Sequence, residues 1–227
     1  MKPLGYVIHK LGNTEGSRRN RMTEIRKQII YAMLLGDSYI QPTGKLNARL
    51  RFEHSINQFD YLMWKAKFFR EKFLGAPKIL SRFNPKFGKT YEYVRWQSSS
   101  CLEFGEARKV FYEANKKIIP ANIDSLITSP LALAIWFMDD GYLYRKDKLA
   151  YIYLPKVTDI QQMLLLKMLK HNFQLLPVVK TKKFNSFLFF NVVEIMRLLS
   201  LIRPFVPSCM SYKVSFDPVS TDPLLEK

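Results

Sequence analysis

The chain has 227 residues, of which 48% are hydrophobic and 14% aromatic, enough apolar material for one or two domains with a real core. Its formal net charge of +17 indicates a polyanionic partner, with a generic basic surface as the alternative. No apolar run reaches the roughly 18 residues of a membrane span, and Cys101 and Cys209 match no metal-ligand spacing.

The first elements alternate between helical and strand patterns. Thr23 is a candidate N-cap of an apolar helix that ends at Asp37. A turn at 42–44 leads into an alternating strand over 46–53, which places Leu46 and Phe52 on one apolar face. A helix is then predicted over 56–74, ended by Gly75. It is followed by strands over 78–83 and 91–97, with Gly88 near their turn, and by a helix over 103–114.

The second half repeats this order. Ser129 and Pro130 predict the start of an apolar helix, a cap followed by a proline at the first helical position, and this helix runs to Asp140. After it come strands over 142–145 and 149–154 and a helix that is capped by Thr158 and runs to about residue 173. A hairpin with strands over 178–183 and 187–191 around Asn185 and Ser186 follows, and then a helix over 193–202.

Two pseudo-symmetric units follow from this repetition. Each has the order αββαββα, which makes the fold class α+β, and each would build one four-stranded antiparallel sheet. Two such sheets with basic exposed faces, joined through the two central apolar helices, would form a saddle under which a duplex fits. The predicted division is a basic N-terminal arm over 1–22, a first unit over 23–124, a second unit over 125–217 and a tail over 218–227.

Each unit contains an apolar helix that ends in a carboxylate, Asp37 in one and Asp140 in the other. The C-terminal end of a helix is already negative, so a carboxylate there is poorly placed unless a cation binds. If the two helices pack side by side, the carboxylates meet, and oxygen ligands suit Mg²⁺, for which Mn²⁺ or Ca²⁺ could substitute. Such a metal activates water and stabilises the leaving oxygen of a phosphodiester. A single apolar helix that ends in a carboxylate is more often a capped core helix than a catalytic element. The occurrence of two such helices in matching positions is what favours a catalytic role.

The segments Met33-Leu-Leu-Gly-Asp-Ser-Tyr-Ile40 and Trp136-Phe-Met-Asp-Asp-Gly-Tyr142 resemble the two motifs of monomeric LAGLIDADG homing endonucleases, most closely those of the yeast mitochondrial omega-intron type. The resemblance covers nearly the whole length from about residue 23 to 217. It departs from the family pattern at Ser38, where the motif has glycine. By this resemblance the catalytic residues are Asp37, Asp140, Lys117 and Lys213, and the metal site is formed by Asp37 and Asp140 with Gly36 and the less favoured Asp139 beside them.

The same resemblance turns the exposed faces of the two sheets towards the major groove of DNA. Arginine there favours guanine and asparagine favours adenine, although these side chains are otherwise explained as the solvated side of a sheet. The candidate base contacts are Asn47, Arg49, Arg51 and Glu53, and the candidate phosphate contacts are Lys45, Arg82, Lys86, Arg95, Lys146, Lys148, Lys180 and Lys182.

The resemblance implies a site-specific double-strand DNA endonuclease. It would act as a monomer and would not bind a membrane. With Mg²⁺ it would hydrolyse phosphodiesters of a long asymmetric target and leave staggered 3′ ends. An intron RNA maturase on the same fold and a catalytically silent DNA-binding regulator are the alternatives. Because the N-terminus lacks a convincing transit peptide, the implied location is intracellular, in a mitochondrion or chloroplast or in a bacterial or archaeal cytoplasm.

Overall fold

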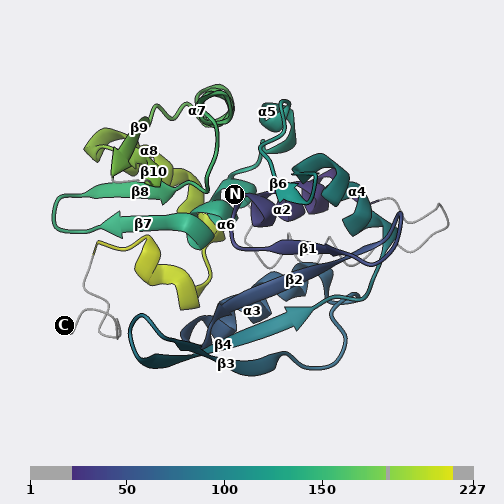
Figure 1. Cartoon of the computed structure of the whole chain (residues 1–227). Helices are drawn as coiled ribbons and strands as arrows, with labels where there is room; N and C mark the ends of the chain where they lie inside the picture. The colour runs from purple at the N-terminus through teal and green to yellow at the C-terminus, as the bar shows by residue number, and fades with distance from the viewer. Residues whose placement is uncertain (1–21, 183–184, 217–227) are drawn as a thin grey trace. The chain divides into compact units, whose positions relative to one another are not determined.

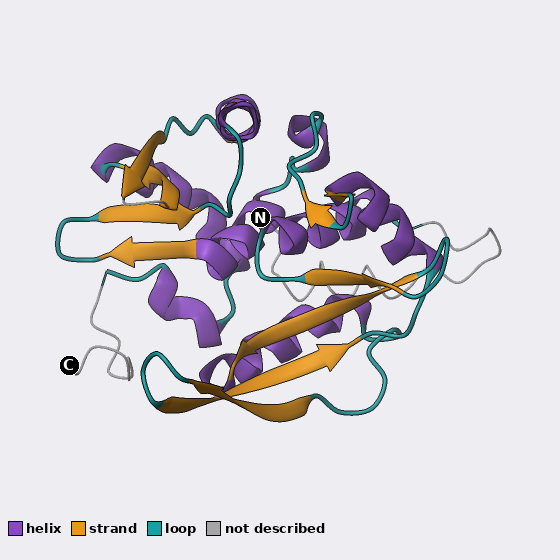
Figure 2. Ribbon diagram, viewed as in Figure 1, coloured by secondary structure: helices purple, strands orange, loops and turns teal. Residues whose placement is uncertain are grey.

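The computed structural model describes residues 22–182 and 185–216 (Figures 1 and 2). The described chain divides into two compact units, one ending at Lys117 and the other beginning at Ile118. All but one residue of the predicted basic arm, and the whole predicted tail, lie outside the described residues. The domain boundaries expected from the sequence remain a prediction.

The first unit contains one antiparallel sheet with the strand order β1-β2-β4-β3. Helix α3 packs against β2 and β4, while α4 packs against β1, β2 and α2. The predicted order is confirmed. Its elements are α2 (Glu24–Leu35), β1 (Tyr39–Pro42), β2 (Ala48–Ser55), η1 (Ile56–Gln58), α3 (Phe59–Ala66), η2 (Lys67–Phe69), β3 (Lys78–Asn84), β4 (Lys89–Gln97), α4 (Leu102–Phe111), β5 (Tyr112–Glu113) and β6 (Lys116–Lys117).

Local chemistry explains where α2 and β2 begin. The Thr23 hydroxyl accepts a hydrogen bond from the Arg26 backbone N–H at 3.4 Å, which caps α2 as predicted. In β2 the side chains alternate, and the core face is fully buried. Leu46 was expected on that face, and this expectation is wrong, because it is 56% exposed. The Thr43 N–H donates to the Asn47 carbonyl at 3.0 Å, which holds Leu46 in the loop before β2.

Two predicted helices are shorter than their sequence patterns. The segment expected as one helix over 56–74 is α3 flanked by the single turns η1 and η2, and Gly75 follows in the left-handed region with φ 72°. The helix expected over 103–114 ends at Phe111. The chain then forms the hairpin of β5 and β6, whose turn has Ala114 and Asn115 at positive φ. This hairpin was not predicted, because neither turn residue is glycine.

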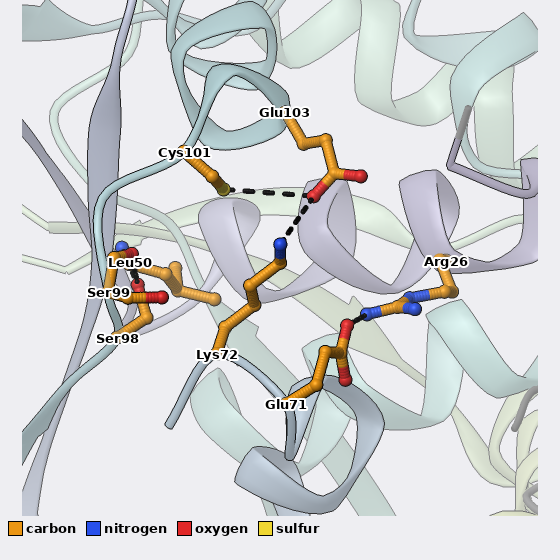
Figure 3. A network of polar contacts seen from close by, with 8 residues as sticks. All are labelled: Arg26, Leu50, Glu71, Lys72, Ser98, Ser99, Cys101 and Glu103. Atoms are coloured by element: carbon orange, nitrogen blue, oxygen red, sulfur yellow. Dashed lines mark hydrogen bonds and ion pairs between the residues drawn. The ribbon is translucent and has the colours of Figure 1, made fainter. Parts of the chain in front are cut away.

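Polar contacts fasten the helices of the first unit to the segment after η2 (Figure 3). Arg26 on α2 forms an ion pair with Glu71, and the next residue, Lys72, has its Nζ 3.9 Å from Glu103 Oε2 on α4. The Cys101 thiol also donates to Glu103 Oε2, at 3.7 Å. The Leu50 N–H donates to Ser98 Oγ at 2.9 Å, and the Ser98 hydroxyl donates to the Ser99 carbonyl at 2.8 Å.

The second unit has an equivalent antiparallel sheet with the order β7-β8-β10-β9. Helix α8 packs on β8 and β10, α6 packs on β7 and β8, and α5 packs on α7. Asn185 and Ser186 were expected to form the second turn; they lie in β10 instead. The elements are α5 (Ile123–Leu126), α6 (Pro130–Asp140), β7 (Gly141–Tyr144), β8 (Leu149–Tyr153), α7 (Asp159–Phe173), β9 (Val178–Lys182), β10 (Asn185–Phe190), α8 (Val192–Ile202), η3 (Arg203–Phe205) and η4 (Ser208–Lys213).

Helix α6 is the most deeply buried element of this unit. All eight residues from Leu131 to Met138 are buried, as a helix that is apolar on every side requires. Its start is capped as predicted, because Ser129 Oγ accepts from the Ala132 N–H at 3.2 Å. No helix among the described residues is long and apolar enough to cross a membrane.

Candidate active site and nucleic-acid interface

In the first unit, Asp37 lies just beyond the end of α2. The Gly36 N–H donates to the Ala32 carbonyl at 3.2 Å and the Ser38 N–H donates to the Met33 carbonyl at 3.0 Å, so the last turn is closed around Gly36. Gly36 is buried, whereas the Asp37 side chain is 48% exposed. The chain therefore presents a carboxylate to solvent at the negative end of a buried helix.

Lys117 reaches this helix end from the last strand of the unit. Its Nζ donates to the Gly36 carbonyl oxygen at 2.7 Å. Lys117 stands on β6, and it is placed by its pairing with Tyr112 across the β5–β6 hairpin. A cation on the last carbonyls of a helix is favoured by the helix dipole, so the lysine also offsets the negative potential around Asp37.

Arg108 holds the lysine-bearing hairpin against β1. Its Nη1 donates to the Ile40 carbonyl at 2.7 Å and its Nη2 donates to Asn115 Oδ1 at 2.7 Å, while the Ile40 N–H donates to the Tyr112 hydroxyl at 3.2 Å. The hairpin is thus tied to the strand that follows Asp37. Arg108 is not recognisable as a site residue from the sequence, because its partners lie up to 68 residues away in sequence.

A histidine lies beside Asp37. His54 belongs to the core face of β2, its side chain is buried, and its Nδ1 is 4.0 Å from Asp37 Oδ2. Its ring centroid is 5.3 Å from that of Tyr61 on α3. His54 was not among the site residues predicted from the sequence, since its position in the chain shows no link to Asp37. The proximity arises only when β2 packs beneath the end of α2.

In the second unit, Asp139 and Asp140 are the last two residues of α6, and both are partly exposed. Lys213, at the end of η4, donates from its Nζ to the Gly141 carbonyl at 2.8 Å and to the Asp139 carbonyl at 3.4 Å. A side chain at Gly141 would not fit, because its Cβ would lie 2.3 Å from the Phe137 carbonyl oxygen. Gly141 therefore lets the chain leave α6 directly into β7.

Two arginines hold the segment that carries Lys213. Arg145, just after β7, donates from Nη2 to the Tyr212 carbonyl at 2.9 Å and from Nε to the Ser215 carbonyl at 3.2 Å. Arg203 donates from Nε to the Val214 carbonyl at 3.1 Å. Neither role is predictable from the sequence, because every residue has a main-chain carbonyl and the accepting residue therefore need not be of any particular type.

Each unit therefore combines a carboxylate at the end of an apolar helix with a lysine bound to a carbonyl of that turn. The atoms at each helix end that could bind a metal are carboxylate and carbonyl oxygens, which are the ligands that Mg²⁺ prefers. No group of three or more histidine, cysteine, aspartate or glutamate residues that could hold a metal occurs among the described residues. Mg²⁺ is commonly held by one or two carboxylates together with water and substrate phosphates, so the residues present fit it.

On the outward face of the first sheet, Glu53 is bracketed by two arginines. Arg82 Nη2 donates to Glu53 Oε1 at 3.0 Å, and Arg95 Nε donates to Glu53 Oε2 at 2.9 Å. Burial alone would raise the pKa of the Glu53 carboxyl, but the hydrogen bonds from Arg95 and Arg82 outweigh it and hold this pKa below its ordinary value. Three predicted DNA contacts thus form one network.

The other predicted contacts lie on the same two sheets or at their turns. Arg49 and Arg51 share the outward side of β2 with Glu53, and the Arg51 guanidinium carbon is 4.9 Å from the Tyr39 ring centroid. In the first unit, Lys45 and Asn47 lie in the loop before β2, and Lys86 lies in the β3–β4 turn. In the second unit, Lys146 and Lys148 lie in the β7–β8 turn, and Lys180 and Lys182 lie on β9. All seven residues are exposed.

Comparisons with known proteins agree with this fold and with the motif positions. The chain is 26% identical over 194 residues to the cytochrome b mRNA maturase bI2 of Debaryomyces hansenii, covering 82% of this chain and 72% of that protein. It is 24% identical over 206 residues to the probable intron-encoded endonuclease 1 of Wickerhamomyces canadensis, covering 86% of each.

Among solved structures, the homing endonuclease I-WcaI bound to its DNA recognition sequence has the same fold. The TM-score is 0.80 at 23% identity, and the match covers 92% of this chain and 98% of that one. The sequence profile of the LAGLIDADG DNA endonuclease family matches residues 27–198, a span that includes α6 and all of α2 except its first turn. The chain belongs to the LAGLIDADG DNA endonuclease family.

Proposed function

We propose that the protein is a site-specific double-strand DNA endonuclease that requires Mg²⁺ and acts as a monomer. The observation that carries this proposal is the arrangement found in both units, where a lysine Nζ lies within 2.8 Å of a carbonyl oxygen adjacent to Asp37 or Asp140. Both units contain the acidic side chain and the lysine. A silent DNA-binding regulator would need neither.

In the proposed mechanism, the residues that would hold divalent metal are Asp37 in the first unit and Asp140 in the second. Bound Mg²⁺ would lower the pKa of a coordinated water and stabilise the leaving oxygen of the phosphodiester. Lys117 and Lys213 would donate hydrogen bonds to the attacking water or to a non-bridging phosphate oxygen. Each lysine is already oriented by its carbonyl contact, which limits the rearrangement needed when DNA binds.

The test is cleavage of a genomic duplex library that contains the flanks of the host gene. We expect one recurrent staggered cut in Mg²⁺, no cut in EDTA, and loss of double-strand cutting in Asp37→Asn and in Asp140→Asn while binding to the recovered target persists. Asp159→Asn, at an exposed carboxylate at the start of α7, is the control, and it should still cut. Cutting by both of the first two variants would overturn the assigned carboxylates, and a library left intact by the unaltered protein would overturn the nuclease.

A second candidate function is assistance to intron splicing. It is favoured by the similarity, over 82% of this chain, to a protein described as a cytochrome b mRNA maturase. Under this reading, splicing of the host intron in the presence of the purified protein should survive Asp37→Asn and Asp140→Asn. An organellar site of action is part of this proposal, with a bacterial or archaeal cytoplasm as the alternative.

A further inference from the structure

A buried histidine lies beside the acidic residue of the first unit. His54 stands on the core face of β2 and is 5% exposed, and its Nδ1 is 4.0 Å from Asp37 Oδ2. The Asp37 side chain is 48% exposed. One oxygen of a half-exposed carboxylate therefore faces an imidazole in the core, while much of the same side chain is open to solvent.

The imidazole is held in place by packing. Its strand pairs with β4, where Val94 is the register partner of His54 and is fully buried. The ring centroid of Tyr61 lies 5.3 Å from that of His54, and Tyr61 in turn stacks on Trp64 at 5.8 Å. Side chains in a close-packed core sit in defined rotamers, so His54 offers Asp37 a fixed neighbour.

The nitrogen that faces Asp37 can carry a proton without any charge on the ring. Both the imidazolium and the neutral tautomer protonated at Nδ1 present an N–H there. At 4.0 Å the contact is electrostatic and longer than a hydrogen bond. The last torsion of an aspartate side chain is broad, and the attraction of one oxygen by a fixed N–H would restrict it. The other oxygen would then keep a constant direction towards a ligand.

The strand register identifies the corresponding position in the second unit. The tyrosine that stands two residues after each acid pairs with Arg51 in the first unit and with Tyr151 in the second. Three residues further along, the core side carries His54 in the first unit and Leu154 in the second, and Leu154 is 8% exposed. The leucine side chain has no N–H to offer a carboxylate. The two acids therefore have different neighbours at an equivalent position.

We propose that His54 is a positioning residue for Asp37, and that Asp140 works without an equivalent. The inference rests on the proposed endonuclease activity and adds to it an inequality between the two carboxylates. The cut that depends on Asp37 should depend on His54 as well, whereas the cut that depends on Asp140 should not. His54 takes up and releases no proton in this role. The competing outcome is that His54 serves only to fill the core of the first unit.

The test compares the two cuts in a supercoiled plasmid that carries the recovered target, at saturating protein in Mg²⁺. His54→Leu introduces the side chain that the second unit has at this position, so the fold should tolerate it. We expect one of the two cuts to slow about 10- to 100-fold, as when a group that orients a metal ligand is removed, and nicked circles to accumulate. End-labelled duplex should show all nicks in the same strand. His54→Gln keeps an N–H donor and should cut both strands at nearly the normal ratio.

Leu154→Ala is the matched control, because it alters the equivalent buried position of the second unit. It should lower the free energy of unfolding without changing the ratio of the two cuts. Equal slowing of both cuts by His54→Leu would overturn the inference. The same strand bias in His54→Gln as in His54→Leu would also overturn it.

A second measurement needs neither metal nor cleavage. Urea unfolding in EDTA is compared for the unaltered protein, His54→Leu, Asp37→Ala and the double variant. We expect the two single effects on the free energy of unfolding not to add in the double variant, because either substitution alone already removes the contact. The corresponding cycle of Leu154→Ala with Asp140→Ala should be additive.

This cycle separates the two proposals. Additive effects of the His54 and Asp37 substitutions would overturn the positioning role whether or not the protein cuts DNA. A protein that shows the coupling but cuts no target would overturn the endonuclease and leave the contact between His54 and Asp37 established.

Discussion

Lys117 and Lys213 each place an ammonium group on a main-chain carbonyl within one residue of an acidic side chain. These hydrogen bonds, to one carbonyl for Lys117 and to two for Lys213, hold each ammonium group at the end of a helix that carries an acidic side chain. The long lysine side chain loses part of its rotamer freedom in the free protein, so less is lost when substrate binds. The same contact occurs in two units whose lysines lie on different kinds of element, a short strand and a 3₁₀ turn.

Replacing either lysine should therefore reduce the rate and leave DNA affinity nearly intact. We expect Lys117→Met and Lys213→Met to lower the single-turnover cleavage rate about 100-fold, measured on the recovered target at saturating protein. Lys116→Met, which removes the exposed neighbouring lysine of the same hairpin, is the control. A loss of equal size in Lys116→Met would show that only the charge of the hairpin matters.

The Glu53 network predicts a specific dependence of stability on pH. The pKa of the folded Glu53 carboxyl is lowered, so its ion pairs contribute fully above the unfolded pKa of about 4.3 and are lost as the pH falls through the lower folded value. We expect Glu53→Gln to reduce the free energy of unfolding by up to about 1 kcal/mol at neutral pH, and by less as the pH drops below about 4. Urea unfolding of both proteins between neutral and acidic pH measures this difference, and a difference independent of pH would contradict it.

At the scale of elements, helix α4 packs unusually close to the loop before β2. A Cβ at Gly105 would lie 1.7 Å from the Leu46 carbonyl oxygen, a distance that no side-chain movement can relieve. The close contact between α4 and this loop explains why residue 105 is glycine. In the interior of a helix, glycine otherwise costs about 1 kcal/mol of stability relative to alanine. The same contact also explains the exposed Leu46, since its backbone lies against α4 while its side chain points away from the core face.

Gly105→Ala should consequently destabilise the first unit although it improves helix propensity. We expect a net loss of about 1–3 kcal/mol in the free energy of unfolding, the usual range for overpacking, measured by urea denaturation. Gly44→Ala is the matched control, because nothing lies within 4 Å of its added Cβ and it belongs to the same loop. Unchanged stability in Gly105→Ala would mean that the loop moves freely away from α4.

At the scale of the whole molecule, the net charge of +17 predicts strongly salt-dependent binding to DNA. If six or more phosphates are contacted, affinity for a duplex should fall at least about 1,000-fold between about 50 and 200 mM salt. Replacing Lys146 and Lys148 together by alanine should reduce the slope of log affinity against log salt by about two. Replacing Lys170, an exposed lysine of α7, should leave the slope unchanged, and an equal change there would refute the assigned phosphate contacts.

Much of the fold could be predicted because it is encoded locally. The caps at Thr23, Ser129 and Thr158 form as expected, and at Thr158 the Gln161 side chain completes a capping box. Strand positions also follow from alternation, as in β2. Element ends were predicted less well. The helix over 56–74 tightens into 3₁₀ turns, the helix over 103–114 ends early in a hairpin, Leu46 lies in a loop, and Asn185 and Ser186 lie in β10.

The sequence by itself determined the order of the elements, the repeat, the charge and the two carboxylates at the ends of apolar helices, since these depend on residues close together in the chain. Only the tertiary structure decided which side chains meet across long separations. His54 beside Asp37, Arg108 on Ile40 and Arg145 on Tyr212 are such pairs. Strand register and helix packing set these contacts, and a shift of one residue in register would turn each strand side chain to the opposite face.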